Sequence, residues 1–394
     1  MTASASVRVG AFPELGRPLR VAMVGLRAPG AEGGVESVVA ELGPRLVERG
    51  CDVTVACRAR YNSHGTRWKG LSLVDVPTVY TKHLESIVHT ALSLRVVLAG
   101  GFDLIHVHAV GNALLSFLPK SVGVPTVVTV HALDWRREKW GRGAQTVLRA
   151  GAWAAGRWPD SVITVSEETA SWFEGSRAPV VRIPNGVTEL AHARLVEAGV
   201  DGLQPGFALY LGRLVPEKNL ETLIRAFAAS RYPGELVITG GHGHAPEYLA
   251  KISRLAADLA PGRVRFTGSR FDRAKAALLR HAGVVAFPSH LEGLPLAMLE
   301  AMSCGRTVLG SDIAPHRELL HGGCGVLLPM NDVAAWTRAL EASADGRFAG
   351  MGHRAASRAV EQYGWDPIAD QTIEVYRDVL AARTGRLRRH PGRV

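Results

Sequence analysis

The stretch Phe287–Gly305 reads FPSHLEGLPLAMLEAMSCG and is the most informative part of the chain. A strand-like apolar run ends at Pro288, and a polar loop then carries Glu292 and Gly293. Pro295 suits the first turn of the nearly apolar helix that we expect next. This order of strand, loop and helix is typical of open α/β sheets, which bind ligands at the carboxyl ends of their strands.

Two carboxylates fall within this stretch, Glu292 in the loop and Glu300 inside the expected helix. Both are open to interpretation as solvated surface charges. For Glu300 the apolar neighbours argue against that, because a charge in a largely buried helix needs a partner. A ribose diol is a suitable partner, since one carboxylate can accept two hydroxyl hydrogen bonds.

Strand-like runs and helical segments alternate on both sides of this stretch. This alternation predicts parallel sheets covered by helices on both faces, in two α/β halves. The expected strands are 19–25, 52–56, 103–108, 126–130 and 161–165 in the first half, where 73–80 is also strand-like. In the second half they are 207–212, 235–240, 263–268, 284–288, 307–310 and 325–328.

The pattern pauses after the PNGV sequence at residues 184–187, which predicts two domains. We expect residues 1–18 to be disordered and residues 383–394 to form a basic tail. Between them we predict an N-terminal domain over 19–189, a linker over 190–205, a C-terminal domain over 206–365, and a helix over 366–382 that returns to the N-terminal domain.

Composition sets limits on the class of protein. The 394 residues are 47% hydrophobic and 21% charged, which is ordinary for a globular protein of two domains. The net charge of +10 favours an anionic partner. The Arg-rich C-terminal end either contacts a polyanion or a membrane, or is an ordinary solvated tail.

The four cysteines lack zinc-ligand spacing, so we expect buried thiols. With no signal-like start and no apolar run of membrane-spanning length, we expect a cytoplasmic protein, at most peripheral at the inner membrane face.

Two loops have the composition of anion sites. Residues 212–219, GRLVPEKN, follow a strand and bring Arg213 and Lys218 near one another, where they either converge on a phosphate or are solvated separately. Residues 25–36, GLRAPGAEGGVE, form a Gly-rich turn before a helix, and such turns bind phosphate through backbone N–H groups. This turn lacks the dinucleotide and P-loop spacings.

Histidines follow or occupy two strands of the first half. His131 lies just past a strand, where it either binds a sugar hydroxyl, protonates a leaving group or pairs with local backbone. His106 and His108 alternate and so share one face of their strand. We expect no metal site there, because no carboxylate or third histidine is spaced near them.

Together these motifs resemble family 4 retaining glycosyltransferases of the GT-B fold. The resemblance rests on the two spaced glutamates, GRLVPEKN, IPNGV at 183–187, GGVE at 33–36 and YGWDPIADQTIEVYRDVL at 363–380, and extends over about 19–382. It implies two Rossmann-like domains that face each other across a cleft, with the final helix crossing back. Residues 81–93 and 131–149 also resemble bacterial rhamnosyltransferases and related polysaccharide enzymes.

The resemblance implies roles for individual residues. Glu292 would hold sugar hydroxyls, Glu300 the ribose, and Arg213 with Lys218 the diphosphate, while His131 would contact the transferred sugar. Catalytic residues would be His131, Arg213, Lys218 and Glu292. Donor-binding residues would be Gly33, Gly34, Arg213, Lys218, Arg270, Glu292, Gly293, Leu294, Leu296, Ala297 and Glu300.

Two positions depart from the family pattern. Pro295 has no N–H to donate, so Leu296 and Ala297 would have to supply the backbone donors at the helix start. Thr188 stands where the family commonly has Asp, which puts an acidic role there in doubt.

The expected activity is retaining transfer of a hexosyl group to a saccharide, glycolipid or natural-product hydroxyl. UDP-sugars are the first choice of donor, ahead of dTDP- and GDP-sugars, and no metal or other cofactor is expected because no Asp-x-Asp lies at a strand end. A nucleotide-sugar epimerase of the same fold and a non-catalytic sugar-nucleotide-binding or membrane-scaffold protein are alternatives. A dehydrogenase is disfavoured by the absent fingerprint, and nucleic acid is not an expected partner.

The acceptor is expected on the N-terminal domain. Thr81 is a candidate N-cap and Glu85 falls in the following first turn, which leaves His83 free for another role. Asp134 and Trp135 follow His131 in a loop, where an exposed Trp would either stack on a sugar or pack on a neighbour. We therefore predict that His83, Asp134 and Trp135 line the acceptor pocket.

Overall fold

The computed structural model describes most of the chain as two compact units. Unit 1 comprises the described residues up to Arg136 together with Trp140–Asn185 and the chain from Trp365, and unit 2 comprises Gly186–Gly364 with Arg137. The described residues are 12, 15–81, 84–137, 140–187, 202–243 and 245–389, with side chains to 383.

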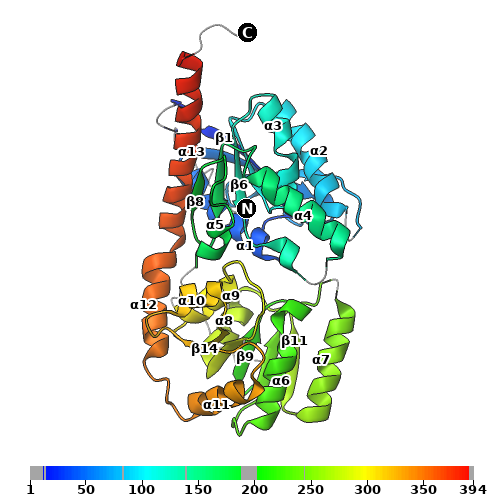
Figure 1. The fold of residues 1–394 in the computed structure, drawn as a ribbon, viewed down its shortest axis with the longest axis vertical. Coiled ribbons are helices and arrows are strands. Elements are labelled where there is room, and N and C mark those ends of the chain that lie inside the picture. Colours follow the sequence, from blue (N-terminus) through cyan, green and yellow to red (C-terminus); the bar gives the residue numbers. More distant parts are fainter. Residues whose placement is uncertain are drawn as a thin grey trace, which may run out of the picture. The chain divides into compact units, whose positions relative to one another are not determined.

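Unit 1 is built on one sheet, coloured from blue to green in Figure 1. Across its described residues the strand order is β3-β4-β2-β1-β5-β6-β7-β8, and every neighbouring pair is parallel except β3 with β4. The central strands are buried on both faces, as expected for a parallel sheet covered by helices. Its strands are β1 (Leu19–Val24), β2 (Cys51–Arg58), β3 (Arg67–Trp68), β4 (Leu71–Val76), β5 (Leu104–His108), β6 (Thr126–Val130), β7 (Ser161–Thr164) and β8 (Val180–Arg182).

The helices of unit 1 include the C-terminal one. They are α1 (Gly34–Glu48), α2 (Glu85–Ala99), α3 (Phe117–Ser121), α4 (Arg142–Ala155), α5 (Glu167–Ser171) and α13 (Trp365–Arg389), with 3₁₀ turns η1 (Ala59–Tyr61), η2 (Asn112–Leu115) and η3 (Asp134–Arg136).

The packing of unit 1 begins before the expected domain start at residue 19. Ahead of β1, Phe12 is buried and Arg17 pairs with Asp103.

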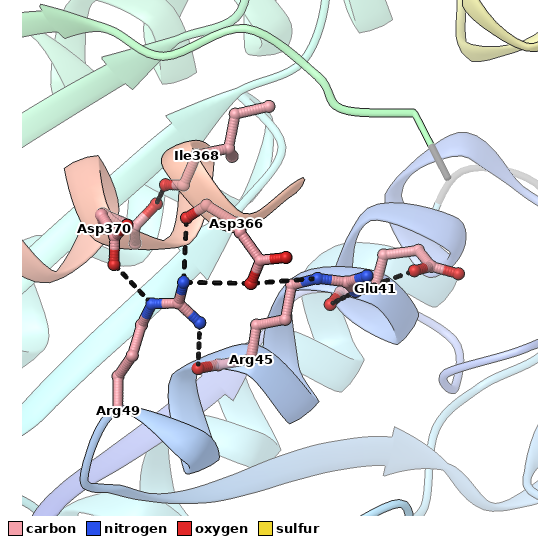
Figure 2. A network of polar contacts seen from close by, with 7 residues as sticks. Glu41, Arg45, Arg49, Asp366, Ile368 and Asp370 are labelled. Atoms are coloured by element: carbon pink, nitrogen blue, oxygen red, sulfur yellow. Dashed lines mark hydrogen bonds and ion pairs between the residues drawn. The ribbon is translucent and has the colours of Figure 1, made fainter. Parts of the chain in front are cut away.

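A polar network joins α1 to the first turn of α13 (Figure 2). Arg49, just past the end of α1, donates from Nε to Asp370 at 2.6 Å and from Nη2 to Asp366 at 3.0 Å. Arg45, one turn earlier, pairs with Glu41 at 2.9 Å. Asp366, in the first turn of α13, also suits the positive end of the helix dipole. The predicted return of the C-terminal helix to the first domain is therefore confirmed.

Unit 2 repeats the layered design with a second parallel sheet. Its described strands have the order β11-β10-β9-β12-β13-β14. The core on one side surrounds the fully buried Trp336. The strands are β9 (Ala208–Leu211), β10 (Leu236–Thr239), β11 (Val264–Gly268), β12 (Val284–Phe287), β13 (Thr307–Ser311) and β14 (Val326–Leu328).

Helices cover the unit 2 sheet and carry the loops that hold the candidate site. The helices are η5 (Pro216–Lys218), α6 (Leu220–Ala229), α7 (Pro246–Leu259), α8 (Asp272–His281), α9 (Leu296–Ser303), α10 (Ala314–Leu320), α11 (Val333–Ala344) and α12 (Met351–Tyr363). The predicted class, two Rossmann-like α/β halves, is confirmed.

Two expectations about the chain as a whole can be compared with the structure. All four cysteines are buried as free thiols, as predicted. Among the described residues no helix combines the length and the apolar character needed to span a bilayer.

Candidate active site

The loops after β9 and β12 meet at the carboxyl edge of the unit 2 sheet. The two strands are hydrogen-bonded neighbours and run parallel, so the loop that starts at Gly212 and the loop that starts at Pro288 emerge side by side. Gly240 directly follows β10 beside them, and a Cβ there would collide with the carbonyl oxygen of Gly212. The edge therefore depends on a glycine at position 240 for its close packing.

Lys218 and Glu292 come together from these two loops. Lys218 Nζ donates to Glu292 Oε1, and Ser289 Oγ donates to the same oxygen at 2.7 Å. Both charged side chains are largely buried, 14% and 10% exposed. Burial alone would raise the pKa of Glu292, but the Lys218 ammonium brings it below its usual range. The carboxylate is therefore ionised and held in place.

Arg213 lies near this pair, on the same loop as Lys218. Burial is the main cause that lowers the pKa of Lys218, and the positive charge of Arg213 lowers it further. Two cations that repel each other in a half-buried loop are arranged as an anion site requires. His316, in the first turn of α10, is a neighbour of Glu292 that the sequence did not indicate. It is buried, and burial lowers its pKa to about 4.

Glu300, in the largely apolar helix α9, forms an ion pair with Lys275 of α8. Lys275 Nζ donates to Glu300 Oε1 at 2.5 Å, with side chains 25% and 21% exposed. Glu300 is therefore paired within the protein, and its contact with a ribose diol stays a prediction. The ion pair was missed, because only the fold brings α8 against α9.

The N-terminus of α9 lies between the two glutamates. Pro295 is the N-cap residue and Leu296 begins the helix, so the expectation that Pro295 lies within the first turn is wrong by one position. The N–H groups of Leu296 and Ala297 precede the first intrahelical hydrogen bonds. Gly293 and Leu294 are buried in the loop ahead of them. Arg270 follows β11, at the margin of the same carboxyl edge.

In unit 1, the Gly-rich turn after β1 differs from the expected phosphate loop. Gly33 is the N-cap of α1 and Gly34 its first residue, as an anion site would need. The carboxylate of Glu36, however, folds back against Gly33 and accepts the Arg27 N–H at 3.1 Å. An acid that is only 8% exposed therefore already lies at this helix N-terminus.

His131 belongs to a row of stacked histidines. His108 Nδ1 lies 3.1 Å from His131 Nε2, and the ring centroids of His106 and His108 are 4.3 Å apart. His106 also hydrogen-bonds Tyr376 of α13 and Thr129 of β6, each at 2.7 Å. His131 is therefore a third histidine beside His106 and His108, which the spacing in the sequence did not indicate. Among the described residues no cluster of His, Cys, Asp or Glu has a metal-binding arrangement.

Burial keeps this row uncharged. Desolvation lowers the pKa of His106 to about 3 and that of His131 to about 4, and it lowers the pKa of His108 well below its usual value. At neutral pH His131 is therefore a neutral imidazole, fit to exchange hydrogen bonds with a hydroxyl but poorly suited to protonate a leaving group.

The residues predicted to line an acceptor pocket have different environments. Trp135 is only 2% exposed and packs against Trp172 in the apolar core, so the expectation of an exposed Trp135 is wrong. Asp134 is half-buried in η3. His83 lies outside the described residues, as does Thr188.

The start of α2 also departs from the predicted cap. The helix begins at Glu85 with Leu84 as N-cap, so Thr81 is not the N-cap residue, although its Oγ1 accepts the Leu84 N–H at 3.4 Å. Glu85 is in the first turn as predicted. It forms a buried ion pair with Arg58 of β2 at 3.0 Å, which gives it a structural role.

Comparison with known proteins settles the family. Residues 32–189 match the model described as Glycosyltransferase Family 4, and residues 206–345 match the model described as Glycosyl transferases group 1. A D-inositol 3-phosphate glycosyltransferase from Gordonia bronchialis is 30% identical over 91% of this chain and 88% of its own length. This chain belongs to glycosyltransferase family 4. It transfers a sugar from a nucleotide-sugar donor.

Further relatives agree with this assignment. A phosphatidyl-myo-inositol mannosyltransferase from Mycobacterium tuberculosis is 28% identical over 92% of this chain and 98% of its own. Among solved structures, a sucrose-phosphate synthase from Thermosynechococcus elongatus has the same fold, with a TM-score of 0.78 at 23% identity over 92% of this chain and 99% of its own. The narrower rhamnosyltransferase likeness is not borne out, because these relatives are named for inositol, mannose and sucrose chemistry.

Proposed function

We propose that this family 4 enzyme is a metal-independent, retaining hexosyltransferase whose donor is a UDP-sugar, with dTDP- and GDP-sugars as the alternatives. The observation that carries the proposal is the buried Lys218–Glu292 pair with Arg213 beside it, at the carboxyl edge of the unit 2 sheet. Transfer without a metal ion and retention of the anomeric configuration are both typical of the family, which supports these two features of the proposal.

Lys218 and Arg213 would stabilise the negative charge that develops on the leaving diphosphate. The bond between the sugar carbon and the diphosphate oxygen breaks, and negative charge grows on the leaving diphosphate. Lys218 donates one of its three N–H bonds to Glu292 and so keeps two for phosphate oxygens. With Arg213 and the start of α9 it forms a preorganised electrostatic site, in which Arg and Lys take the place of a divalent ion.

The carboxylates bind the neutral parts of the donor. Glu292 is ionised and accepts hydrogen bonds, so it suits hydroxyls of the transferred sugar. Glu300 engages Lys275 through Oε1 only, and its Oε2 would accept from the ribose diol. Gly293, Leu294, Leu296 and Ala297 would add backbone contacts, and Arg270 would approach the base.

Unit 1 would contribute His131 and the Gly33–Gly34 turn. Because the pKa of His131 is about 4, we assign it a hydrogen bond to a sugar hydroxyl and no acid catalysis. Its Nε2 is engaged with His108, so Nδ1 would face the sugar. At the Gly33–Gly34 turn, Glu36 would have to move before the backbone N–H groups bind phosphate.

The acceptor would be a hydroxyl of a saccharide, glycolipid or natural product. Because two relatives are named for inositol phosphate and phosphatidylinositol, we would try cyclitol phosphates first as acceptors. Asp134 and His83 stay candidates for acceptor contacts, whereas the burial of Trp135 argues against sugar stacking on that ring.

The donor can be identified by thermal shift with UDP-, dTDP- and GDP-sugars, followed by a transfer assay with an acceptor panel. A ligand at a hundred times its dissociation constant adds about 2.7 kcal/mol to stability, which is a readily measured shift. We expect a UDP-sugar to stabilise the wild type and not Arg213→Ala. Stabilisation of both proteins alike would reject the site, and release of an epimer without transfer to any acceptor would favour the epimerase.

A further inference from the structure

A second concave site lies in unit 1, at the opposite edge of the sheet from His131. A cavity of about 320 Å³ opens between the end of α4 and the segment after α5. Its walls include Trp153 and Trp172, three arginines, Arg149, Arg157 and Arg177, and a single acid, Glu174. This volume is at the lower end of the range for small-molecule sites.

The topology separates this cavity from the donor chemistry. Its segments 156–157 and 174–177 come just before β7 and β8, so they lie at the amino edge of the sheet. His131 and the Gly33 turn follow β6 and β1, so they lie at the carboxyl edge. These segments therefore lie at the other edge of the sheet from the unit 1 residues that we assign to the donor.

The two tryptophans are exposed and yet held in fixed orientations. Trp153 is 54% exposed and Trp172 47%. Trp172 leans on the buried Trp135 with ring centroids 4.8 Å apart, and Trp153 meets Trp158 edge to face at 5.4 Å. Indole rings braced in this way have already lost their conformational freedom, so a ligand that stacks on them avoids that entropic cost.

The cations are available to a ligand. Among the described residues, the guanidinium groups of Arg149 and Arg177 have neither a hydrogen bond nor an ion pair. Arg157 lies over the Trp153 ring at 5.1 Å, which leaves its donors at the rim of the cavity. Helix α4 itself contains no acidic residue. The cavity is therefore cationic as well as aromatic.

We propose that this cavity is an accessory binding site for an acidic saccharide, one whose sugar rings carry a carboxylate or phosphate. The C–H faces of the sugar pack on the negative faces of Trp153 and Trp172, and the forked guanidinium groups of Arg149 and Arg177 bind the anion. A concave site of this volume holds a short stretch of sugar rings, which distinguishes it from a flat lipid-binding face. The binding step needs no donor, so it stands apart from the proposed transfer reaction.

The test is calorimetric titration of the full chain with tetrasaccharides of hyaluronan, alginate and polygalacturonate, and with neutral chitotetraose. We expect at least one uronate tetrasaccharide to bind at least tenfold more tightly than chitotetraose. Trp153→Ala and the double variant Arg149→Gln/Arg177→Gln should each weaken that binding tenfold or more. Arg95→Gln, which removes an exposed arginine of α2, should leave it unchanged, and donor-induced thermal shifts should be the same in all variants.

Three results would overturn the proposal. One is that the wild type binds none of the uronate tetrasaccharides at millimolar concentration. Another is that the cavity variants bind as the wild type does. The third is that the protein sediments with phosphatidylglycerol vesicles in a Trp153-dependent way and ignores the saccharides, which would assign the surface to a membrane. Trp172→Phe keeps the packing on Trp135 and shows whether any loss reflects misfolding.

Discussion

Acidification should destabilise unit 1 through its buried histidines. His89, in α2, has no exposed surface, and burial is the main reason that its pKa falls to about 4. His106 and His131 show the same effect, with pKa values of about 3 and 4. In the unfolded chain each of these groups has an ordinary pKa near 6.5.

The sign and size of the effect follow from proton linkage. Between pH 6.5 and 4 the unfolded chain binds protons that the folded chain does not, so the free energy of unfolding is greatest above pH 6.5 and decreases as the pH falls through this window. For one histidine with a folded pKa of about 4, lowering the pH from 7 to 5 removes about 2 kcal/mol of stability.

His89→Gln isolates one such contribution. Urea unfolding at pH 7 and pH 5, followed by tryptophan fluorescence, reports mainly on unit 1, which holds every tryptophan except Trp336. We expect the variant to lose about 2 kcal/mol less than the wild type between these pH values. His353→Gln, at an exposed position, should lose as much as the wild type. If His89→Gln loses as much as the wild type does, His89 is not a buried neutral group and the reasoning is refuted.

Four other outcomes are expected. Lys275→Ala should raise the donor dissociation constant about tenfold without loss of fold, because Glu300 loses the contact that orients it; unchanged binding by calorimetry would contradict this. Transfer should continue in excess EDTA, and loss restored by magnesium would reject the metal-independent site. Arg49→Ala should lower the free energy of unfolding by about 1 kcal/mol, since its partners are exposed. Tyr376→Phe should cost about 1–3 kcal/mol, because His106 Nδ1 is left buried without its partner, and an unchanged urea midpoint would argue otherwise.

The sheet strands that could be predicted are the buried ones. Runs such as 126–130 and 284–287 are uniformly buried and mostly apolar because helices cover both faces of the sheet. The two short edge elements, β3 and β8, were missed. They have two and three residues, each with exposed positions, so neither has a hydrophobic pattern that rises above that of a loop.

The candidate site was predictable only as far as its loops. Gly212–Asn219 and Pro288–Pro295 could be recognised individually, but the direct Lys218–Glu292 contact depends on β9 and β12 being neighbours, although six elements separate them in sequence. The contributions of Lys275 and His316 depend in the same way on tertiary contacts. Trp135 was misjudged because a short 3₁₀ turn looks like a loop in sequence, and yet it directs this ring into the core.

The charges in the unit 2 site account for the stability of the cationic loop that we propose as the phosphate site. Two neighbouring cations in a half-buried loop repel each other, and neither would be stable there alone. Glu292 neutralises Lys218, and Glu300 neutralises Lys275, so most of the charge at this edge is paired within the protein. In the proposed reaction a diphosphate would add negative charge next to Lys218 and Arg213, while the carboxylates would keep oxygens for neutral hydroxyls. The same paired charges would thus stabilise the fold and separate the anionic part of a donor from its hydroxyl-bearing part.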